Sequence, residues 1–254
     1  MSAPAQPTAC VIIIGNEILS GRTKDENLPY LAKRLGQLGI PVKEALVIPD
    51  VETRIIDAVN DARSRFTYVF TTGGIGPTHD DITAASVATA FGLNVEVHPE
   101  AKRILEHYYG ETANPARMRM AMVPHGAELI ANPVSAAPGF RLGNVHVLAG
   151  VPRIMQAMFE GLAHTLSGGD PVLSRAVSAE AREGDIAEAL EAIQAEHPNV
   201  DIGSYPFGLG ERIGVCIVGR STNRADLDTA MDKVSRIFQA LGLDPSESDP
   251  AATN

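Results

Sequence analysis

Three glycines and two aspartates stand close together in the stretch TTGGIGPTHDD, residues 71–81. Glycines expose the backbone N–H groups, and such donors at a helix N-terminus can surround a phosphate. Two carboxylates beside a phosphate would repel it unless a divalent cation such as Mg²⁺ bridges the two kinds of oxygen. The stretch therefore predicts a phosphate or pyrophosphate ester that is bound together with a metal. The residues concerned are Gly73, Gly74, Gly76, Asp80 and Asp81.

A structural explanation of the acidic pair is also open. Thr78 could cap a helix, and Asp81 three residues later could reach back to it, as in a capping box. A cap does not explain the sequence GGIG after a buried strand. The stretch is neither a Walker A loop, which needs Gly-Lys-Ser/Thr, nor a dinucleotide fingerprint, since the third glycine is missing.

Three other loops carry polar or turn-forming residues. In GNEILSGRTKDEN, residues 15–27, Glu17 and Asp25 are candidates for a general base, and the alternative is a solvated loop. NPVSAAPGF, residues 132–140, contains a Pro-Gly turn, and LAGVP, residues 148–152, leads into a helix. The alternative for both is ordinary loop punctuation.

Strands that alternate with helices must position these loops. Such an order predicts a parallel sheet with helices on both faces, and ligands bind such sheets at the carboxyl ends of the strands. Residues 71–81 leave one of these ends. We expect strands at 9–14, 41–48, 68–72, 94–97 and 145–150, and helices at 28–38, 50–62, 83–91, 99–109, 114–122 and 154–166.

The rhythm changes after SGGDP, residues 167–171, which is typical of a linker. The order strand, helix, strand, strand, helix then predicts a small antiparallel α+β domain. We expect a first domain over 1–168, the small domain over 172–243 and a disordered tail over 244–254.

Composition limits the classes of function. The formal net charge is −10 and no run of Lys or Arg exceeds a pair, so a nucleic-acid surface is not expected. The N-terminus lacks the pattern of a signal peptide, and the longest apolar run is too short to span a bilayer, which favours the cytoplasm. Cys10 and Cys216 lie in apolar strand-like runs and are expected to be buried small hydrophobes.

Four of the segments quoted above (GNEILSGRTKDEN, TTGGIGPTHDDIT, NPVSAAPGF and GVP) resemble, in this order, the molybdopterin-binding MoaB/MogA-like domain. The version that begins the competence/damage-inducible protein A (CinA) family is the closer match, over residues 9–165. The resemblance implies a three-layer α/β fold with a mostly parallel sheet. DIGSYPF is similar to part of the small α+β domain that follows in CinA proteins, and a related domain precedes the synthetase part of some FAD synthases.

The resemblance also bears on function. In the molybdopterin adenylyltransferase branch the position that matches Asp81 belongs to the acting site, and the preceding residue is usually Arg rather than Asp80. This departure fits CinA-type proteins, whose matching domain is associated with metal-dependent hydrolysis of ADP-ribose-like pyrophosphates. Full-length CinA proteins carry a deamidase domain, which this sequence lacks, so deamidation is not expected.

Three functions therefore stand at this point. The first is a metal-dependent nucleotide pyrophosphatase, a hydrolase acting on an ADP-ribose-like or FAD-like substrate. The second is a non-catalytic module that binds or senses molybdopterin or a nucleotide. It is motivated by Ala149 and Ile154, which are unusual for the family, and the residues Ser135, Ala136 and Ala137 are a further departure. The third, a DNA-uptake or repair factor, is disfavoured by the acidic charge.

The predicted site follows from the loops and the resemblance together. Its ligand is a small phosphate or pyrophosphate compound, with Mg²⁺ or a similar divalent metal, and the resemblance implies a homo-oligomer, dimer or trimer. The predicted catalytic residues are Asp81, Asp80, Glu17 and Asp25, and Asp80 and Asp81 are also the predicted metal ligands. The predicted substrate-binding residues are Gly15, Asn16, Gly21, Asn27, Thr72, Gly73, Gly74, Gly76, Pro77, Thr78, Thr83, Asn132, Ser135, Pro138, Gly139, Gly150, Val151 and Pro152.

Overall fold

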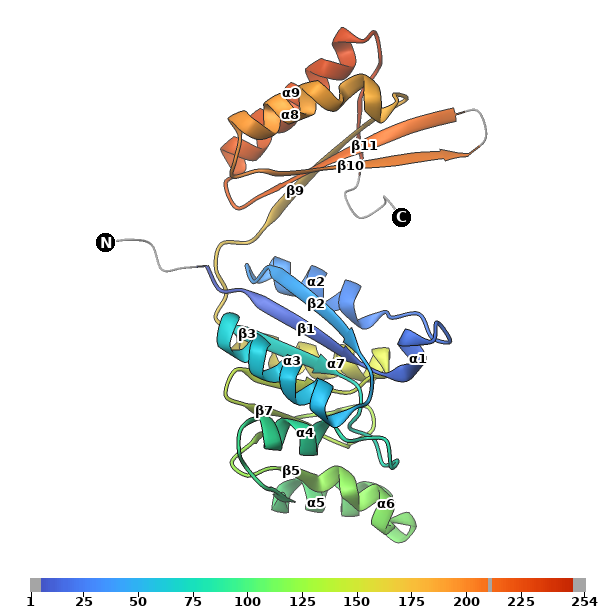
Figure 1. Ribbon diagram of the computed structural model, residues 1–254, viewed down its shortest axis with the longest axis vertical. Helices are drawn as coiled ribbons and strands as arrows, with labels where there is room; N and C mark the ends of the chain where they lie inside the picture. Colours follow the sequence, from blue (N-terminus) through green and yellow to red (C-terminus); the bar gives the residue numbers. More distant parts are fainter. Residues whose placement is uncertain (1–5, 210–211, 249–254) are drawn as a thin grey trace, which may run out of the picture. The chain divides into compact units, whose positions relative to one another are not determined.

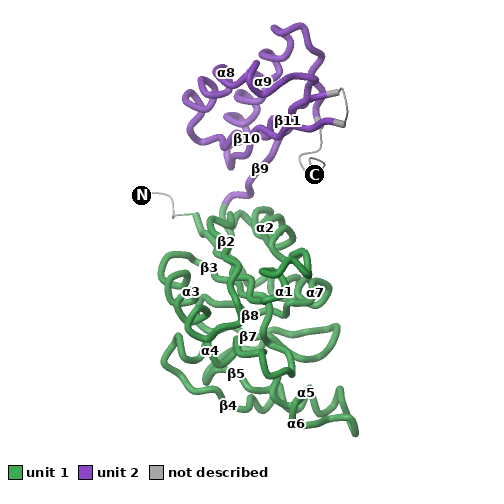
Figure 2. Tube along the Cα trace, turned by 45° about the vertical axis from the view of Figure 1, so that its right-hand side comes forward, with its two compact units in different colours: residues 1–169 green, residues 170–254 purple. Residues whose placement is uncertain are grey.

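The structure is a computed structural model that describes residues 6–209 and 212–248. The chain divides into two compact units, residues 1–169 and residues 170–254 (Figure 2). Among the described residues, no helix is both long enough and apolar enough to cross a bilayer. Each unit has its own hydrophobic core and is described by itself below.

The first unit is built on a six-stranded sheet in the order β2-β1-β3-β8-β7-β6 (Figure 1). The four strands β2, β1, β3 and β8 run parallel, and β7 and β6 are antiparallel to their neighbours. The sheet is therefore mostly parallel, as the sequence predicts. Its strands are β1 (Ala9–Ile14), β2 (Val42–Ile48), β3 (Tyr68–Thr72), β6 (Glu128–Ile130), β7 (Gly139–Leu142) and β8 (Val145–Leu148).

Strand β1 is buried along its whole length because its side chains serve two cores. Cys10, Ile12 and Ile14 face one apolar cluster, which includes residues of α3 and α4. The alternate residues of β1 face a second cluster, which includes residues of α2 and α7. This alternation is what a strand with helices on both faces requires. The three-layer α/β fold is thus confirmed.

The helices of the layers begin and end near the predicted positions. Helix α2 ends before Gly39, whose φ of 72° continues the chain in the left-handed region. Asp50 does not cap α3, because its carboxylate accepts a hydrogen bond from the backbone N–H of Asn16 instead. The helices are α1 (Asn16–Leu19), α2 (Asn27–Gln37), α3 (Glu52–Arg65), α4 (Thr83–Ala90) and α7 (Pro152–Leu162), and a 3₁₀ turn η3 (Ala163–Thr165) follows α7.

Residues 95–124 leave the main sheet and form a separate element, here called the side segment. Its first and last strands pair with each other antiparallel, so the predicted strand at 94–97 is real but does not join the main sheet. The predicted helix at 114–122 is broken into a short helix and a 3₁₀ turn. The side segment contains β4 (Val95–Val97), α5 (Pro99–Tyr109), η1 (Gly110–Thr112), α6 (Pro115–Met118), η2 (Arg119–Ala121) and β5 (Met122–Pro124).

The second unit is a four-stranded antiparallel sheet in the order β10-β11-β9-β12, packed with two helices. Strand β12 corrects the prediction of a disordered tail from residue 244, because it pairs with β9 and Glu247 accepts a hydrogen bond of 2.5 Å from Arg175. The rest of the predicted tail, residues 249–254, lies outside the described residues. The elements are β9 (Leu173–Ala179), α8 (Glu183–Glu196), β10 (Asp201–Leu209), β11 (Arg212–Ser221), α9 (Arg224–Ala240) and β12 (Ser246–Ser248).

Both cysteines are buried thiols, as the sequence predicts. Burial raises the pKa of the Cys10 thiol to about 12. A thiol with so high a pKa is a poor nucleophile, because the thiolate is the reactive form. Cys10 therefore serves the core of the first unit rather than chemistry.

Candidate functional site

The glycine loop, residues 73–78, leaves the carboxyl end of β3, and its first residue has a structural role. Gly73 donates its backbone N–H to the carbonyl oxygen of Leu148 at 3.2 Å. It has a φ of 102°, and a Cβ added there would lie 2.1 Å from the carbonyl oxygen of Ile14. Only glycine fits this close approach of two strand ends. The amide of Gly73 is thus occupied, which corrects its prediction as a phosphate donor.

The amides of Gly74 and Gly76 are in a different position. Gly74 has a φ of 68°, and its carbonyl accepts the N–H of Thr83, the first residue of α4, at 3.0 Å. The Thr83 hydroxyl donates to the carbonyl of Gly73 at 3.0 Å, so helix and loop are fixed to each other. Among residues 6–209 and 212–248, no acceptor occupies the N–H of Gly74 or Gly76. These two amides remain as donors for a ligand.

Asp81 folds back over the glycine loop. Its Oδ2 accepts hydrogen bonds from the backbone N–H of Thr78 at 2.8 Å and from the Thr78 hydroxyl at 2.5 Å. These contacts resemble half of the capping box that the sequence left open, but α4 begins only at Thr83, so they close a turn ahead of the helix. A Cβ on Gly76 would lie 2.7 Å from the same carboxylate, so Asp81 lies directly against the loop.

Asp80 is exposed and does not line the pocket described below. Hydrogen bonding with the Thr78 side chain, and then with its own backbone, holds the pKa of Asp80 below its usual value. The Thr78 hydroxyl has a single proton to donate. In this conformation Asp81 accepts it, because the hydroxyl oxygen lies 2.5 Å from the Asp81 carboxylate. Both carboxylates therefore lie near one hydroxyl, but only Asp81 faces the pocket.

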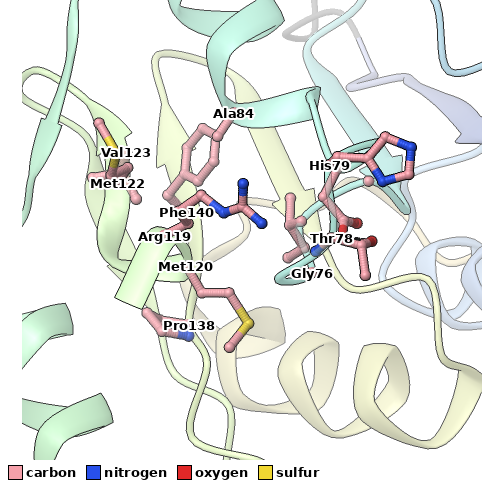
Figure 3. A pocket seen from close by; sticks show the side chains of 13 residues that line it. Gly76, Thr78, His79, Ala84, Arg119, Met120, Met122, Val123, Pro138 and Phe140 are labelled. Atoms are coloured by element: carbon pink, nitrogen blue, oxygen red, sulfur yellow. Dashed lines mark hydrogen bonds between the residues drawn. The ribbon is translucent and has the colours of Figure 1, made fainter. Parts of the chain in front are cut away.

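The pocket has a volume of about 120 Å³ and lies between the glycine loop and the side segment (Figure 3). Its polar wall is the glycine loop with the turn that follows, and its other wall is mostly apolar. This combination of a few converging polar groups with apolar side chains is typical of small-molecule sites. The lining residues are Gly74, Ile75, Gly76, Thr78, His79, Asp81, Ala84, Arg119, Met120, Met122, Val123, Pro138 and Phe140.

Arg119 is the main residue that sequence reasoning missed. It comes from η2 in the side segment, and its Nη2 donates to the carbonyl oxygen of Pro77 in the glycine loop at 2.6 Å. Figure 3 shows its guanidinium pointing toward Gly76 and Thr78. One signal was available: residues 112–127 contain two arginines and no acidic residue, in a chain whose net charge is −10.

The acidic residues of the first loop do not line the pocket. Asp25 accepts hydrogen bonds from the backbone N–H groups of Asn27, at 3.3 Å, and Leu28, at 2.9 Å. It thus satisfies free donors at the start of α2, as a capping residue does. The carboxylate of Glu17 lies over Gly15, where an added Cβ would be 2.6 Å from its Oε1. The structure does not bring Glu17 or Asp25 into the pocket with Asp81.

The ends of β1, β3 and β8 nevertheless meet. The Asn27 side chain donates to the carbonyl of Gly150 at 2.8 Å, and a Cβ on Gly150 would lie 3.1 Å from the Cα of Gly73. Three buried oxygens lie near these strand ends without a partner among the described residues, namely Asn27 Oδ1, Thr71 Oγ1 and Thr72 Oγ1. The first loop, the glycine loop and the loop after β8 therefore share one edge of the sheet.

The loop NPVSAAPGF is held by Asn132. Its side-chain oxygen accepts the N–H groups of Val134 and Ser135 at 3.0 Å, and its amide donates to the Ser135 hydroxyl and the Ala137 carbonyl at 2.8 Å. Ala136 has a φ of 63°, an unfavourable conformation for a residue other than glycine. Only Pro138 of the predicted residues in this loop lines the pocket.

The remaining predicted residues have structural positions. Gly139 begins β7, where a Cβ would lie 2.2 Å from the carbonyl of Val147. Val151 and Pro152 form the start of α7, since the Val151 carbonyl accepts the N–H of Met155 at 2.9 Å. Asn16 begins α1, and Gly21 is an exposed turn residue with a φ of 71°. None of these lines the pocket.

The donor set fits a metal that arrives with a phosphate ligand rather than one held by the protein alone. In the part of the chain that the structure describes, no three His, Cys, Asp or Glu side chains come together as ligands. Asp81 keeps its Oδ1 outside the hydrogen bonds with Thr78. Mg²⁺ is commonly bound by one or two carboxylates together with substrate phosphates and water. Asp81 supplies one such carboxylate in the pocket, whereas Asp80 lies outside it.

Comparisons with known proteins agree with this architecture. The family model described as a probable molybdopterin binding domain matches residues 10–168, and the one described as the middle domain of FAD synthase matches residues 171–245. A protein of Aeropyrum pernix is 35% identical over 96% of this chain and 98% of its own length. Both units are thus present together in a relative of similar length.

Two further relatives carry the name CinA. A CinA-like protein of Desulfosudis oleivorans is 31% identical over 94% of this chain, which spans 60% of that protein. The crystal structure of a CinA protein of unknown function from Thermoplasma acidophilum has a TM-score of 0.60 and 33% identity, covering 63% of this chain and 98% of that one. The chain therefore belongs to the molybdopterin-binding domain family, in its CinA-like form, with a second unit of the FAD synthase middle-domain type.

Proposed function

We propose that the pocket beside the glycine loop binds an ADP-containing dinucleotide or a pterin phosphate in the cytoplasm. We further propose that, with a divalent metal, the protein hydrolyses a pyrophosphate bond in an ADP-ribose-like or FAD-like substrate. One observation carries the proposal: Gly74 and Gly76, whose amides have no acceptor among the described residues, line the same pocket as Asp81. Amide donors suit phosphate oxygens, and the carboxylate suits the cation that accompanies them.

Each residue of the site has its own role in this proposal. Gly74 and Gly76 donate to phosphate oxygens and fix the ligand against the loop, which glycine permits because no side chain intervenes. Asp81 holds the metal or orients the attacking water, because Asp25 is occupied at the start of α2 and Glu17 lies over Gly15. When bound, a divalent metal would lower the pKa of a coordinated water and polarise the phosphorus. Asp80 can supply a second carboxylate from the same turn.

A second candidate is a module that binds or senses molybdopterin or a nucleotide without turnover. The contacts of Asp81 favour it, since its Oδ2 is already engaged by Thr78 and, of the residues that the structure describes, no other carboxylate lines the pocket. A hydrolase needs a group that accepts the proton of the attacking water. A binding module has no attacking water and needs no such group.

Incubation of the purified protein with ADP-ribose or FAD and several divalent metals separates the two. We expect release of AMP, lost in the variant D81N and retained in D57N, which alters an exposed aspartate on α3. Tight binding measured by calorimetry, without AMP under any metal, would instead identify the binding module. Absence of binding to both ADP and pterin ligands would remove both candidates.

The family resemblance also supports self-association. We propose a dimer or trimer, which light scattering at several concentrations would measure directly. A mass corresponding to one chain at all concentrations would reject this proposal.

A further inference from the structure

The pocket contains an arginine side chain as well as the carboxylate of Asp81. Asp81 brings a negative charge to a site intended for an anion, so a phosphate there needs a positive partner. The pocket lining contains one side chain that is always cationic, Arg119. Its position is defined by the hydrogen bond from its Nη2 to the carbonyl of Pro77 at 2.6 Å, one residue after Gly76.

Arg119 has no anionic partner that would explain its place. No ion pair joins it to an acidic residue within the described ranges 6–209 and 212–248. By contrast, Arg103 of the same side segment is bonded through both Nε and Nη2 to Glu100. A guanidinium has five N–H donors, so Arg119 has donors to spare beyond its bond to Pro77.

The bond to Pro77 also limits where these donors lie. It holds the planar guanidinium beside the residues whose amides are unoccupied, and Figure 3 shows the group directed across the pocket toward Gly76 and Thr78. Arginine binds phosphate oxygens through paired, charge-assisted hydrogen bonds, which are stronger than those of neutral donors. The glycine loop and Arg119 together thus form a set of donors from two separate segments.

We propose that Arg119 binds the phosphate of the ligand and supplies the positive charge that offsets Asp81, so that ligand binding does not require a metal. The metal is then needed for turnover alone. This inference rests on the phosphate-binding part of the proposed function, and it extends the site to the side segment. It also makes Arg119 selective for phosphorylated ligands over their uncharged counterparts.

Calorimetry in the presence of EDTA tests the proposal, with inorganic pyrophosphate and ADP-ribose as probes. We expect the wild-type protein to bind both without metal, and R119Q to bind them roughly tenfold to a hundredfold more weakly, the loss that charged hydrogen bonds imply. R119K, which keeps the charge but not the planar fork, should recover part of the affinity. R103Q removes an equal charge from the same segment and should bind as the wild type does.

Each result decides the question. Wild-type affinity in R119Q, or loss of wild-type binding on addition of EDTA, would overturn the proposal. If R119K binds as weakly as R119Q while both unfold at the wild-type temperature, the charge is not the cause and the proposal also fails. If pyrophosphate binds through Arg119 but AMP is never released from ADP-ribose, this inference stands and the hydrolase fails. If the wild type binds no phosphate compound, both fail.

Discussion

The side-chain amide of Asn27 donates a hydrogen bond of 2.8 Å to the carbonyl oxygen of Gly150, which lies 123 positions later in the chain. The bond joins the start of α2 to the loop after β8, and Gly150 of that loop lies against Gly73, the residue after β3. One buried amide thus ties two segments of the sheet edge together. The stability of this edge should depend on the donor character of residue 27.

The variant N27D tests this bond. Aspartate keeps the shape of the side chain but presents an oxygen to the Gly150 carbonyl, in a position that is only 4% exposed. We expect the free energy of unfolding to fall by about 2–4 kcal/mol, since a buried hydrogen bond is replaced by repulsion between acceptors. Urea unfolding measures the change. The matched variant N94D lies at an exposed position, and its free energy of unfolding should stay within about 0.5 kcal/mol of the wild-type value. Equal losses of stability in the two variants would contradict the role of Asn27.

Two glycines allow opposite predictions for the same substitution. G73A places a Cβ 2.1 Å from the carbonyl of Ile14 at a φ of 102°, so we expect a loss of about 2–4 kcal/mol. G36A lies inside α2 with no atom within 4 Å of the new Cβ, so we expect a gain of about 0.5–1 kcal/mol from helix propensity. Thermal unfolding of both variants checks the pair. A G73A protein as stable as the wild type would show that the strand ends are not so close.

Substitutions of Asp25 and Asp81 should have different effects, the first on stability and the second on activity. Asp25 serves the N-terminus of α2, so D25A should lower the free energy of unfolding by about 1 kcal/mol, as loss of a cap does, and leave AMP release per folded molecule unchanged. D81N should abolish turnover. Chemical denaturation and an assay of AMP release on the same preparations measure both. If D25A lost turnover at unchanged stability, Asp25 would be catalytic after all.

Glu160 gives a prediction of pH dependence. The side chain of Arg34, and then that of Tyr30, lowers the pKa of Glu160 to about 2, from an ordinary value of 4.5. A lowered folded-state pKa stabilises the protein above 4.5, and this contribution is lost as the pH falls toward 2. Because the Glu160 side chain is 42% exposed, solvent screening limits the effect to about 0.5–1 kcal/mol.

Urea unfolding of the wild type and E160Q from neutral to acidic pH measures this effect. The two proteins should differ at neutral pH and converge as Glu160 becomes protonated. E106Q is a suitable control, because Glu106 pairs with Lys102 at 3.7 Å on an exposed helix surface. A difference that persists at acidic pH would mean that packing, rather than charge, holds Glu160 to Arg34.

The sequence was most informative where burial is complete. Strand β1 is an unbroken apolar run because both faces pack against helices, and the spacing of leucines in α2 follows one buried face. Strands β5, β6 and β7 have only three or four residues, which is too short for a period to appear. Their conformation depends on pairing with neighbours, as in Phe140 opposite Val147, and local residue types do not reveal such pairing.

The contacts of the site residues with distant segments could not be predicted from local residue types either. Residue types in TTGGIGPTHDD predict donors and carboxylates, and the loop after β3 has both. The sequence does not tell which glycine donates its N–H to the protein itself, because the acceptor of Gly73 is the carbonyl of Leu148 in another strand. Nor does it separate a carboxylate that caps a helix, such as Asp25, from one that faces a pocket. Arg119 was missed because it enters the pocket from a separate segment.

The pocket lies where two independent sheets meet. The glycine loop grows from the six-stranded sheet, whereas Met122 and Val123 belong to the β4–β5 pair, which shares no strand with it. Altering the length or twist of that small two-stranded sheet would widen or narrow the opening while the glycine loop kept its shape. The width of the pocket and the shape of the glycine loop are therefore set by separate parts of the chain.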